Sequence, residues 1–297
     1  NFGQSTDAQA FGTNISRQFA PDNTVGAPDK AATDGTIFKI TAAWRPNEDQ
    51  MWYGTISEGF RAGLLNRPGG NTNPSGTFTV PYALDTDDVT NFELGTKSTF
   101  ASGTFRLNAA LFFVDIENLQ TTIFDTSITN LFFSDNAANA EVLGLEGDFV
   151  WLPAFSDGLT VSGAFSILDT EITEVLTPTN DVRAGDELAY APDFQGTLRA
   201  RYEWDFGNSG LVAHVMPSVS WSSESFSDVI TINRDTIDSW TMLNISAGVS
   251  SESWTAELFI NNLTDERAEV SRNFVFDRTT VTYAQPLTVG VRAGFNF

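Results

Sequence analysis

The chain has 297 residues, with 16 Lys and Arg against 38 Asp and Glu, one His and no Cys, giving a formal charge of −22. This balance argues against a nucleic-acid partner, because phosphate neutralisation needs clustered Lys and Arg. The lack of Cys excludes disulfides and cysteine metal sites. The apolar runs are too short for a transmembrane helix, yet a hydrophobic fraction of 41% argues against a disordered chain.

The two ends of the chain differ in character. Residues 1–35 are polar and rich in Gly, Asp, Thr and Asn, which predicts a loop region. The chain opens at Asn1 without a signal-peptide pattern, and it stops at Phe297 directly after a strand-like run. We therefore expect a chain truncated at its N-terminus and natural at its C-terminus, with 1–35 as a polar outer loop that ends a truncated upstream region.

From residue 36 onward, apolar and polar residues alternate within a series of segments, strictly in some and more weakly in others. In 287–297, Leu287, Val289 and Val291 share one face of an extended segment, while Thr288 and Arg292 lie on the other. A period of two residues predicts β-strands with one apolar and one polar face. The same pattern predicts about eleven strands, near 36–45, 51–61, 90–100, 104–117, 141–151, 158–169, 194–204, 210–222, 240–250, 254–262 and 287–297.

These strands are long, and their connections alternate in length. Most have roughly ten to thirteen residues, whereas a tilted membrane-spanning strand needs about nine to eleven. Short turns are expected at 46–50, 101–103, 153–157, 205–209 and 250–253. Long polar loops are expected at 62–88, 118–138, 170–192, 223–238 and 264–285. Short turns at one rim and long loops at the other are typical of bacterial outer-membrane barrels.

Few residues suggest chemistry. His214, the only histidine, is predicted to face the lumen, and no neighbouring Ser supports a catalytic role. Asp85, Asp87 and Asp88 could offer oxygen ligands to Ca²⁺, but a solvated acidic loop is the favoured interpretation. We therefore predict no enzyme activity and no bound cofactor or metal.

Five segments resemble the barrel of TonB-dependent outer-membrane receptors, in the order found in that family. They are Met51 to Gly63 (MWYGTISEGFRAG), Asn91 to Lys97 (NFELGTK), Asn108 to Gln120 (NAALFFVDIENLQ), Ala138 to Glu146 (ANAEVLGLE) and Asn262 to Glu266 (NLTDE). The terminal Phe297 also matches the aromatic end of such barrels. One departure is Arg267, Ala268 and Glu269, which stand where the family often has an aromatic residue.

The resemblance implies an all-β, transmembrane antiparallel barrel, with 36–297 as the C-terminal part of a barrel of about 22 strands. The missing parts would be an N-terminal plug and the rest of the barrel. It further implies a receptor in the outer membrane of a Gram-negative bacterium, energised by the TonB complex through the plug. The expected solute is a ferric siderophore, a cobalamin-like cofactor or an oligosaccharide.

The predicted ligand contacts lie at the ends of the outer loops. We select Phe60, Arg61, Phe274 and Phe276, with Arg61 alternatively fixing the strand-to-loop turn together with Glu58. Two other classes stay open at this point. A passive porin would share the alternation, and a soluble surface-binding β-protein would use the aromatics in a core.

Overall fold

The structure is a computed structural model that describes residues 33–66, 70–125, 127–128, 131–275 and 278–295. Eleven strands form one antiparallel sheet, in which neighbours along the chain are neighbours in space. In sheet order they are β1 (Lys39–Asn47), β2 (Gln50–Arg61), β3 (Asp87–Phe100), β4 (Phe105–Asp125), β5 (Leu131–Trp151), β6 (Leu159–Val175), β7 (Phe194–Asp205), β8 (Val212–Ser222), β11 (Trp240–Ser250), β12 (Trp254–Asn261) and β15 (Thr288–Phe295).

The remaining described elements are short and lie in the connections. Two small hairpins pair β9 (Ser225–Phe226) with β10 (Thr236–Ile237), and β13 (Glu269–Val275) with β14 (Arg278–Tyr283). Two 3₁₀ turns, η2 (Ala101–Gly103) and η3 (Thr231–Asn233), complete the set. Within the described ranges, no helix has the length and apolarity to cross a membrane.

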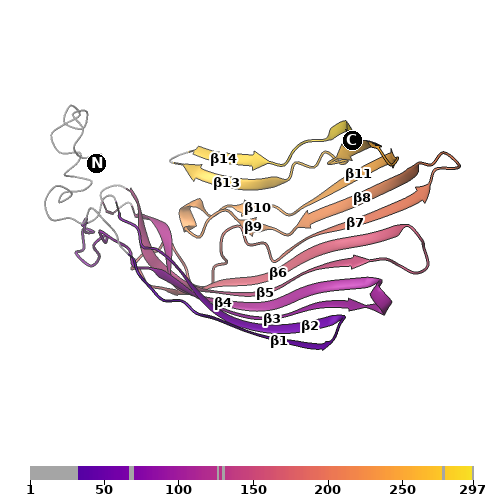
Figure 1. Cartoon of the computed structure of the whole chain (residues 1–297). Helices are drawn as coiled ribbons and strands as arrows, with labels where there is room; N and C mark the ends of the chain where they lie inside the picture. The colour runs from indigo at the N-terminus through magenta and orange to yellow at the C-terminus, as the bar shows by residue number, and fades with distance from the viewer. Residues whose placement is uncertain (1–32, 67–69, 126, 129–130, 276–277, 296–297) are drawn as a thin grey trace.

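The predicted strands and short turns are confirmed over the described residues. Figure 1 shows the sheet as a curved, open wall, with the short turns at one end of the strands and the longer connections at the other. Strands β1 and β15 form its two edges. The predicted loop 1–35 falls almost wholly outside the described residues, and so does Phe297.

Four of the predicted long loops are wrong in part, because they contain strands, among them β9 and β10 within 223–238. Strands β4 and β5 each have 21 residues and fill most of 118–138, and β6 continues to Val175. At about 3.3 Å per residue, a 21-residue strand spans about 70 Å, far more than the roughly 30 Å of a bilayer core. The β4–β5 hairpin therefore projects beyond the membrane. The last long loop, 264–285, contains the β13–β14 hairpin.

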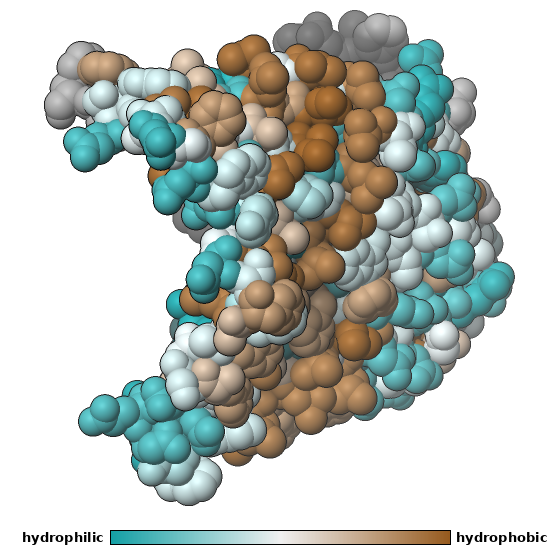
Figure 2. Space-filling view, turned by 90° about the vertical axis from the view of Figure 1, so that its right-hand side faces the viewer, coloured by the Kyte–Doolittle hydropathy of each residue, from teal (hydrophilic) through white to brown (hydrophobic). Residues whose placement is uncertain are grey.

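One face of the wall, called here the outward face, is apolar. Ile56, Phe92 and Phe113 occupy one cross-strand row on this face, and at the other side of the sheet Leu258 and Val291 are 63% and 71% exposed. Figure 2 shows exposed hydrophobic residues as a band across the sheet, with hydrophilic residues on both sides of it. Such a band in contact with water would be costly, whereas lipid makes it favourable.

The opposite, inward face carries a row of charged side chains. Glu203, His214, Gly248, Glu257 and Arg292 follow one another in a row across β7, β8, β11, β12 and β15. His214 Nε2 lies 3.0 Å from Glu257 Oε2, and Arg292 Nη1 donates to Glu257 Oε1 at 2.6 Å. His214 is thus a buried structural partner on the polar face, as the alternation predicts.

The conspicuous glycines of the wall lie beneath aromatic rings of neighbouring strands. A Cβ at Gly95 would come within 2.4 Å of the Tyr53 ring, and one at Gly144 within 2.1 Å of the Phe112 ring. The Tyr53 hydroxyl donates to Glu93 at 2.5 Å. Glu93 and Gly95 of the 91–97 segment therefore contact the same β2 residue, Tyr53. This shared contact explains why they are two residues apart.

The hydrophobic core lies in the outer cap, the part formed by the far ends of the strands and the long connections. One cluster packs Ile123, Ile128 and Phe133 of the β4–β5 hairpin against Val80 of the 62–86 connection. A second cluster, called here the inner cluster, packs Ala138 and Ile172 of the strands against Val182, Val229 and Ile230 of the next two connections. The long connections are therefore packed structures that cover the strand ends.

Candidate ligand-binding site

A recess of about 640 Å³ opens at the tips of the outer cap. Four segments far apart in the sequence supply its walls: the 62–86 connection, the end of the β4–β5 hairpin, and the connections before β7 and β11. Its lining residues are Asn73, Ser75, Thr77, Asp125, Ser127, Pro178, Thr179, Asn180, Asp181, Thr231 and Ile232. This recess, called here the tip recess, lies at the outer end of the described connections.

The tip recess is polar and its charges are negative. Hydroxyl and amide groups dominate the lining, Asp125 and Asp181 are the two carboxylates, and none of the lining residues is Lys, Arg or His. Such groups offer donors and acceptors to hydroxyls and amides, and the two carboxylates disfavour an anion.

Local hydrogen bonds hold the walls of the tip recess in place. The backbone N–H and the hydroxyl of Thr231 both donate to the Asp181 carbonyl, at 2.6 and 2.9 Å. Across the recess, Asn73 Oδ1 accepts the backbone N–H groups of Thr77 and Phe78 at 2.9 and 3.1 Å. The connections before β7 and β11 are thereby joined directly to each other, and the 62–86 connection is held by its own turn.

Phe60 and Arg61, at the end of β2, point to opposite faces of the sheet. The Arg61 guanidinium pairs with Asp87 and also donates to the Gln120 carbonyl at 2.9 Å. Gln120 donates in return to the carbonyls of Arg61 and Asp85, at 3.3 and 3.1 Å. Arg61 therefore fixes the turn from β2 into the outer connection, and any contact with a ligand stays a prediction.

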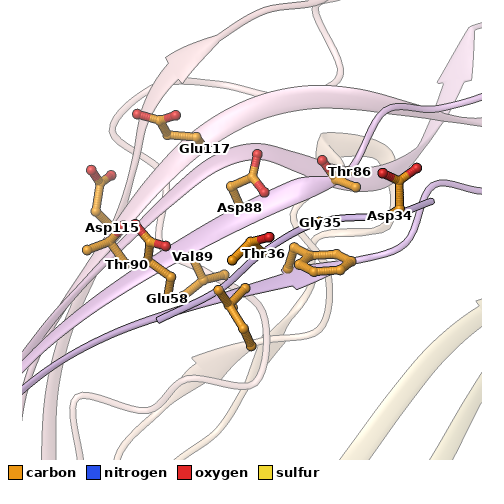
Figure 3. A pocket seen from close by; sticks show the side chains of 13 residues that line it. Asp34, Gly35, Thr36, Glu58, Thr86, Asp88, Val89, Thr90, Asp115 and Glu117 are labelled. Carbon is orange, nitrogen blue, oxygen red and sulfur yellow. The ribbon is translucent and has the colours of Figure 1, made fainter. Parts of the chain in front are cut away.

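Phe60 lies on the outward face, away from the tip recess. Together with Glu58, Asp88, Asp115 and Glu117 it lines a second recess of about 300 Å³, shown in Figure 3 and called here the acidic recess. The segment at Asp34–Gly35 covers it from one side. Phe274 lies half-buried on β13, and Phe276 lies outside the described residues. The structure does not bring Phe60, Arg61 and Phe274 together into one site.

The clustered aspartates at 85–88 do not converge. Asp87 is buried against Arg61, while Asp85 and Asp88 are exposed and Asp88 turns to the acidic recess. Over the part of the chain that the structure describes, no three His, Asp or Glu side chains are arranged to hold a metal ion.

A junction of charged and hydroxyl groups ties the β13–β14 hairpin to the cap. The Arg272 guanidinium donates to both oxygens of Glu269, at 2.6 and 2.8 Å, and to Asp235 at 3.1 Å. The Tyr190 hydroxyl donates to the Arg272 carbonyl at 2.5 Å. The bonds to Glu269, and then to Asp235, hold the pKa of the Arg272 guanidinium above its usual range. Three outer connections therefore meet at this one arginine.

The asparagine of the 262–266 segment anchors both ends of the last outer connection. Asn262 is buried, with φ of +53°, and its amide nitrogen donates to the carbonyls of Glu266 and Gln285 at 2.8 and 3.0 Å. Asp265 accepts the backbone N–H of Leu287 at 2.9 Å. The motif is thus a structural clasp at the base of the connection.

Sequence reasoning missed every residue of the tip recess. The available signal was the run of Asn, Thr, Pro, Ser and Gly at 71–77 and the similar run at 177–181. Each run alone is typical of any surface turn, and only the fold places them together.

An open antiparallel wall with an apolar outward band, short turns at one rim and a folded cap at the other defines a part of an outer-membrane β-barrel. Residues 5–263 match the family described as TonB dependent receptor-like, beta-barrel. The chain belongs to this family, whose members are proteins of the Gram-negative outer membrane and not enzymes. The membership decides against the soluble-protein alternative, whereas active and passive transport are distinguished by the uptake experiment described below.

Solved structures show the same fold at low identity. The ferric yersiniabactin uptake receptor FyuA of Yersinia pestis is 18% identical, with a TM-score of 0.65 over 87% of this chain and 37% of its own. The ferric preacinetobactin receptor BauA of Acinetobacter baumannii is 18% identical, with a TM-score of 0.66 over 91% and 37%. The siderophore receptor PiuA of the same organism is 19% identical, with a TM-score of 0.62 over 86% and 35%.

The chain therefore spans little more than a third of the length of these receptors. No curated protein matches it.

Proposed function

We propose that the chain forms the wall and outer cap of a receptor that imports a scarce solute through the outer membrane, driven by the TonB complex acting on a plug. Membership of the receptor family supports this role. The observation that carries it is the tip recess, because four outer segments together line an open polar recess on the external side of the wall.

A ferric siderophore is the first candidate solute. PiuA is described as a siderophore receptor, FyuA as a ferric yersiniabactin uptake receptor and BauA as a ferric preacinetobactin receptor, and all three share the arrangement of the wall. Because these receptors are only 18–19% identical to this chain, the charge of the solute is argued from the lining of the tip recess and not from their solutes. The proposal for this chain is accordingly a ferric chelate that is neutral or positively charged.

An oligosaccharide is the second candidate, favoured by the lining itself. Asn, Ser and Thr side chains with two carboxylates and no basic residue suit the hydroxyl groups of a neutral sugar. A cobalamin-like cofactor shares the requirement for a polar recess, but no feature of the lining favours it over the other two classes.

The energy requirement is tested with the full-length protein in its own outer membrane. Uptake of radiolabelled solute should stop when a protonophore collapses the energy source of the inner membrane. Uptake that continues unchanged after the protonophore would instead support a passive channel and contradict the proposal.

The solute class is tested by calorimetry on the purified full-length protein. The probes are anionic ferric citrate, a neutral ferric trihydroxamate and maltotriose. We expect binding of one of the neutral probes and its weakening by Thr179→Val, which removes a hydroxyl from the tip recess. Tight binding of ferric citrate alone would refute the charge argument.

A further inference from the structure

An apolar groove of about 500 Å³ lies on the outward face of β1–β5. Its walls are Ile40, Ile56, Phe92, Leu94, Leu111 and Phe113, and its floor is formed where Ala42 and Gly54 pair across the first two strands. The Phe92 and Phe113 rings lie with their centroids 6.5 Å apart. The small floor residues between large side chains make a furrow in the apolar band.

The acidic recess adjoins the outer end of this groove on the same face. Ile56, Phe92 and Phe113 form one cross-strand row, and Glu58, Thr90 and Asp115 form the next row of the same parity. Successive same-face positions lie about 7 Å apart. An elongated molecule can therefore occupy the groove and place its end group among the carboxylates shown in Figure 3.

The charges on this face have one sign. None of the residues that line the groove or the acidic recess is Lys, Arg or His. The basic residues Lys39, Arg61, Lys97 and Arg106 belong to rows of the opposite parity and point inward. A negatively charged end group would meet carboxylates without a compensating cation, whereas a positive one would be attracted.

We propose that this surface binds one amphiphilic lipid, with its acyl chain in the groove and a positively charged amine head in the acidic recess. The groove is continuous with the apolar band that faces the membrane, so a lipid has direct access to it. Charge complementarity then selects the head group. This surface lies on the outward face, apart from the tip recess, and the proposal is independent of the imported solute.

The test uses the full-length protein reconstituted in phosphatidylcholine vesicles. Electron spin resonance measures the immobilised fraction of spin-labelled lipids with equal chains, namely stearylamine, phosphatidylcholine and stearic acid. We expect stearylamine to be preferred over both other lipids, with a preference that weakens as salt screens the charges. A preference for stearic acid, or equal association of all three, would overturn the proposal.

Two variants and one control locate the interaction. Glu58→Gln and Asp115→Asn should each lower the preference for stearylamine by about two- to fivefold, as expected for partly exposed charge pairs. Glu171→Gln removes a carboxylate of the same face outside the acidic recess and should leave the preference unchanged. An equal loss in the control would show a diffuse surface charge effect and refute a defined site.

A third variant tests the groove without altering any charge. A Cβ at Gly54 would meet only the Glu93 carbonyl oxygen, at 3.9 Å, so Gly54→Leu fits the strand and fills the floor. It should lower the immobilised fraction of stearylamine to that of phosphatidylcholine. An unchanged stearylamine preference in Gly54→Leu would contradict acyl-chain binding in the groove even if the charge variants failed to fold.

Discussion

Replacing Ile230 by Ala should open the outer cap while leaving the barrel wall intact. Ile230 is 1% exposed in the inner cluster, where it packs with Ile172 and Val182. The substitution removes three buried carbons at about 0.8 kcal/mol each. With the cavity that remains, the cost is about 2–4 kcal/mol. Because 1.4 kcal/mol is a factor of ten, opening of the cap should become about 30- to 1,000-fold more frequent.

Amide hydrogen exchange on the full-length protein in detergent measures this opening directly. Exchange should accelerate in the connections 176–193 and 223–235, which meet in the inner cluster, while β11 and β12 keep their protection. Leu258→Ala is the matched control. Leu258 is 63% exposed on the outward face, so this substitution removes a similar side-chain volume without creating a buried cavity. Unchanged exchange in both connections after Ile230→Ala would refute the view that this cluster holds the cap together.

Three further substitutions test the junctions of the cap and wall. Arg272→Ala should detach the β13–β14 hairpin and raise amide exchange in β13 at least tenfold, since the guanidinium bridges two carboxylates; unchanged protection would contradict this. Asn262→Ala should cost about 2–4 kcal/mol of local stability through lost hydrogen bonds and a positive φ. Asn262→Gly should cost less, and exchange in the adjacent turn measures both. Glu257→Gln should lower the thermal stability of the wall by about 1–3 kcal/mol, because His214 and an arginine share that carboxylate. Glu203→Gln, in a more exposed ion pair, should cost at most about 1 kcal/mol, and an equal loss in the two variants would argue against the pairing as the cause.

The wall could be predicted from the sequence because the face on which each strand residue lies depends only on its position relative to its immediate neighbours in the chain. Each residue of a barrel strand faces either lipid or the lumen, so the alternation of apolar and polar residues in 287–297 or 194–204 directly predicts a strand. The turns follow the same logic, since the segments 101–103 and 250–253 are too short for anything except a hairpin connection. Even His214 could be assigned to its face by parity alone.

The outer cap could not be predicted in this way. The ladder of β4 and β5 is irregular between Ile116 and Gln120, where Asn118 adopts a φ of +57°, and this shift breaks the alternation that marks a strand. Above the membrane, water replaces lipid, so strand residues such as Ile123 become buried and the facing rule changes. The contact of Ile172 with Ile230 joins residues far apart in sequence, which periodicity cannot reveal.

The location of the acidic charge also needed the structure. The sequence predicts a solvated acidic loop at Asp85, Asp87 and Asp88. Yet Glu58, Asp115, Glu141 and Glu171 occupy one outward cross-strand row on regular strands, directly beyond the apolar rows. The net charge of −22 therefore includes a negative border to the apolar band.

The wall is stable in a lipid environment, whereas the cap is stable in water. The wall has long backbone ladders and an apolar exterior, so its stability depends on hydrogen-bonded pairing within lipid. The cap has buried Ile, Val and Phe clusters, so its stability depends on the hydrophobic effect in water. A cap with its own core can loosen while the wall stays paired, as local opening does in other folds. If the tip recess binds the imported solute as proposed, this separation lets the recess change shape while the wall stays paired in the membrane.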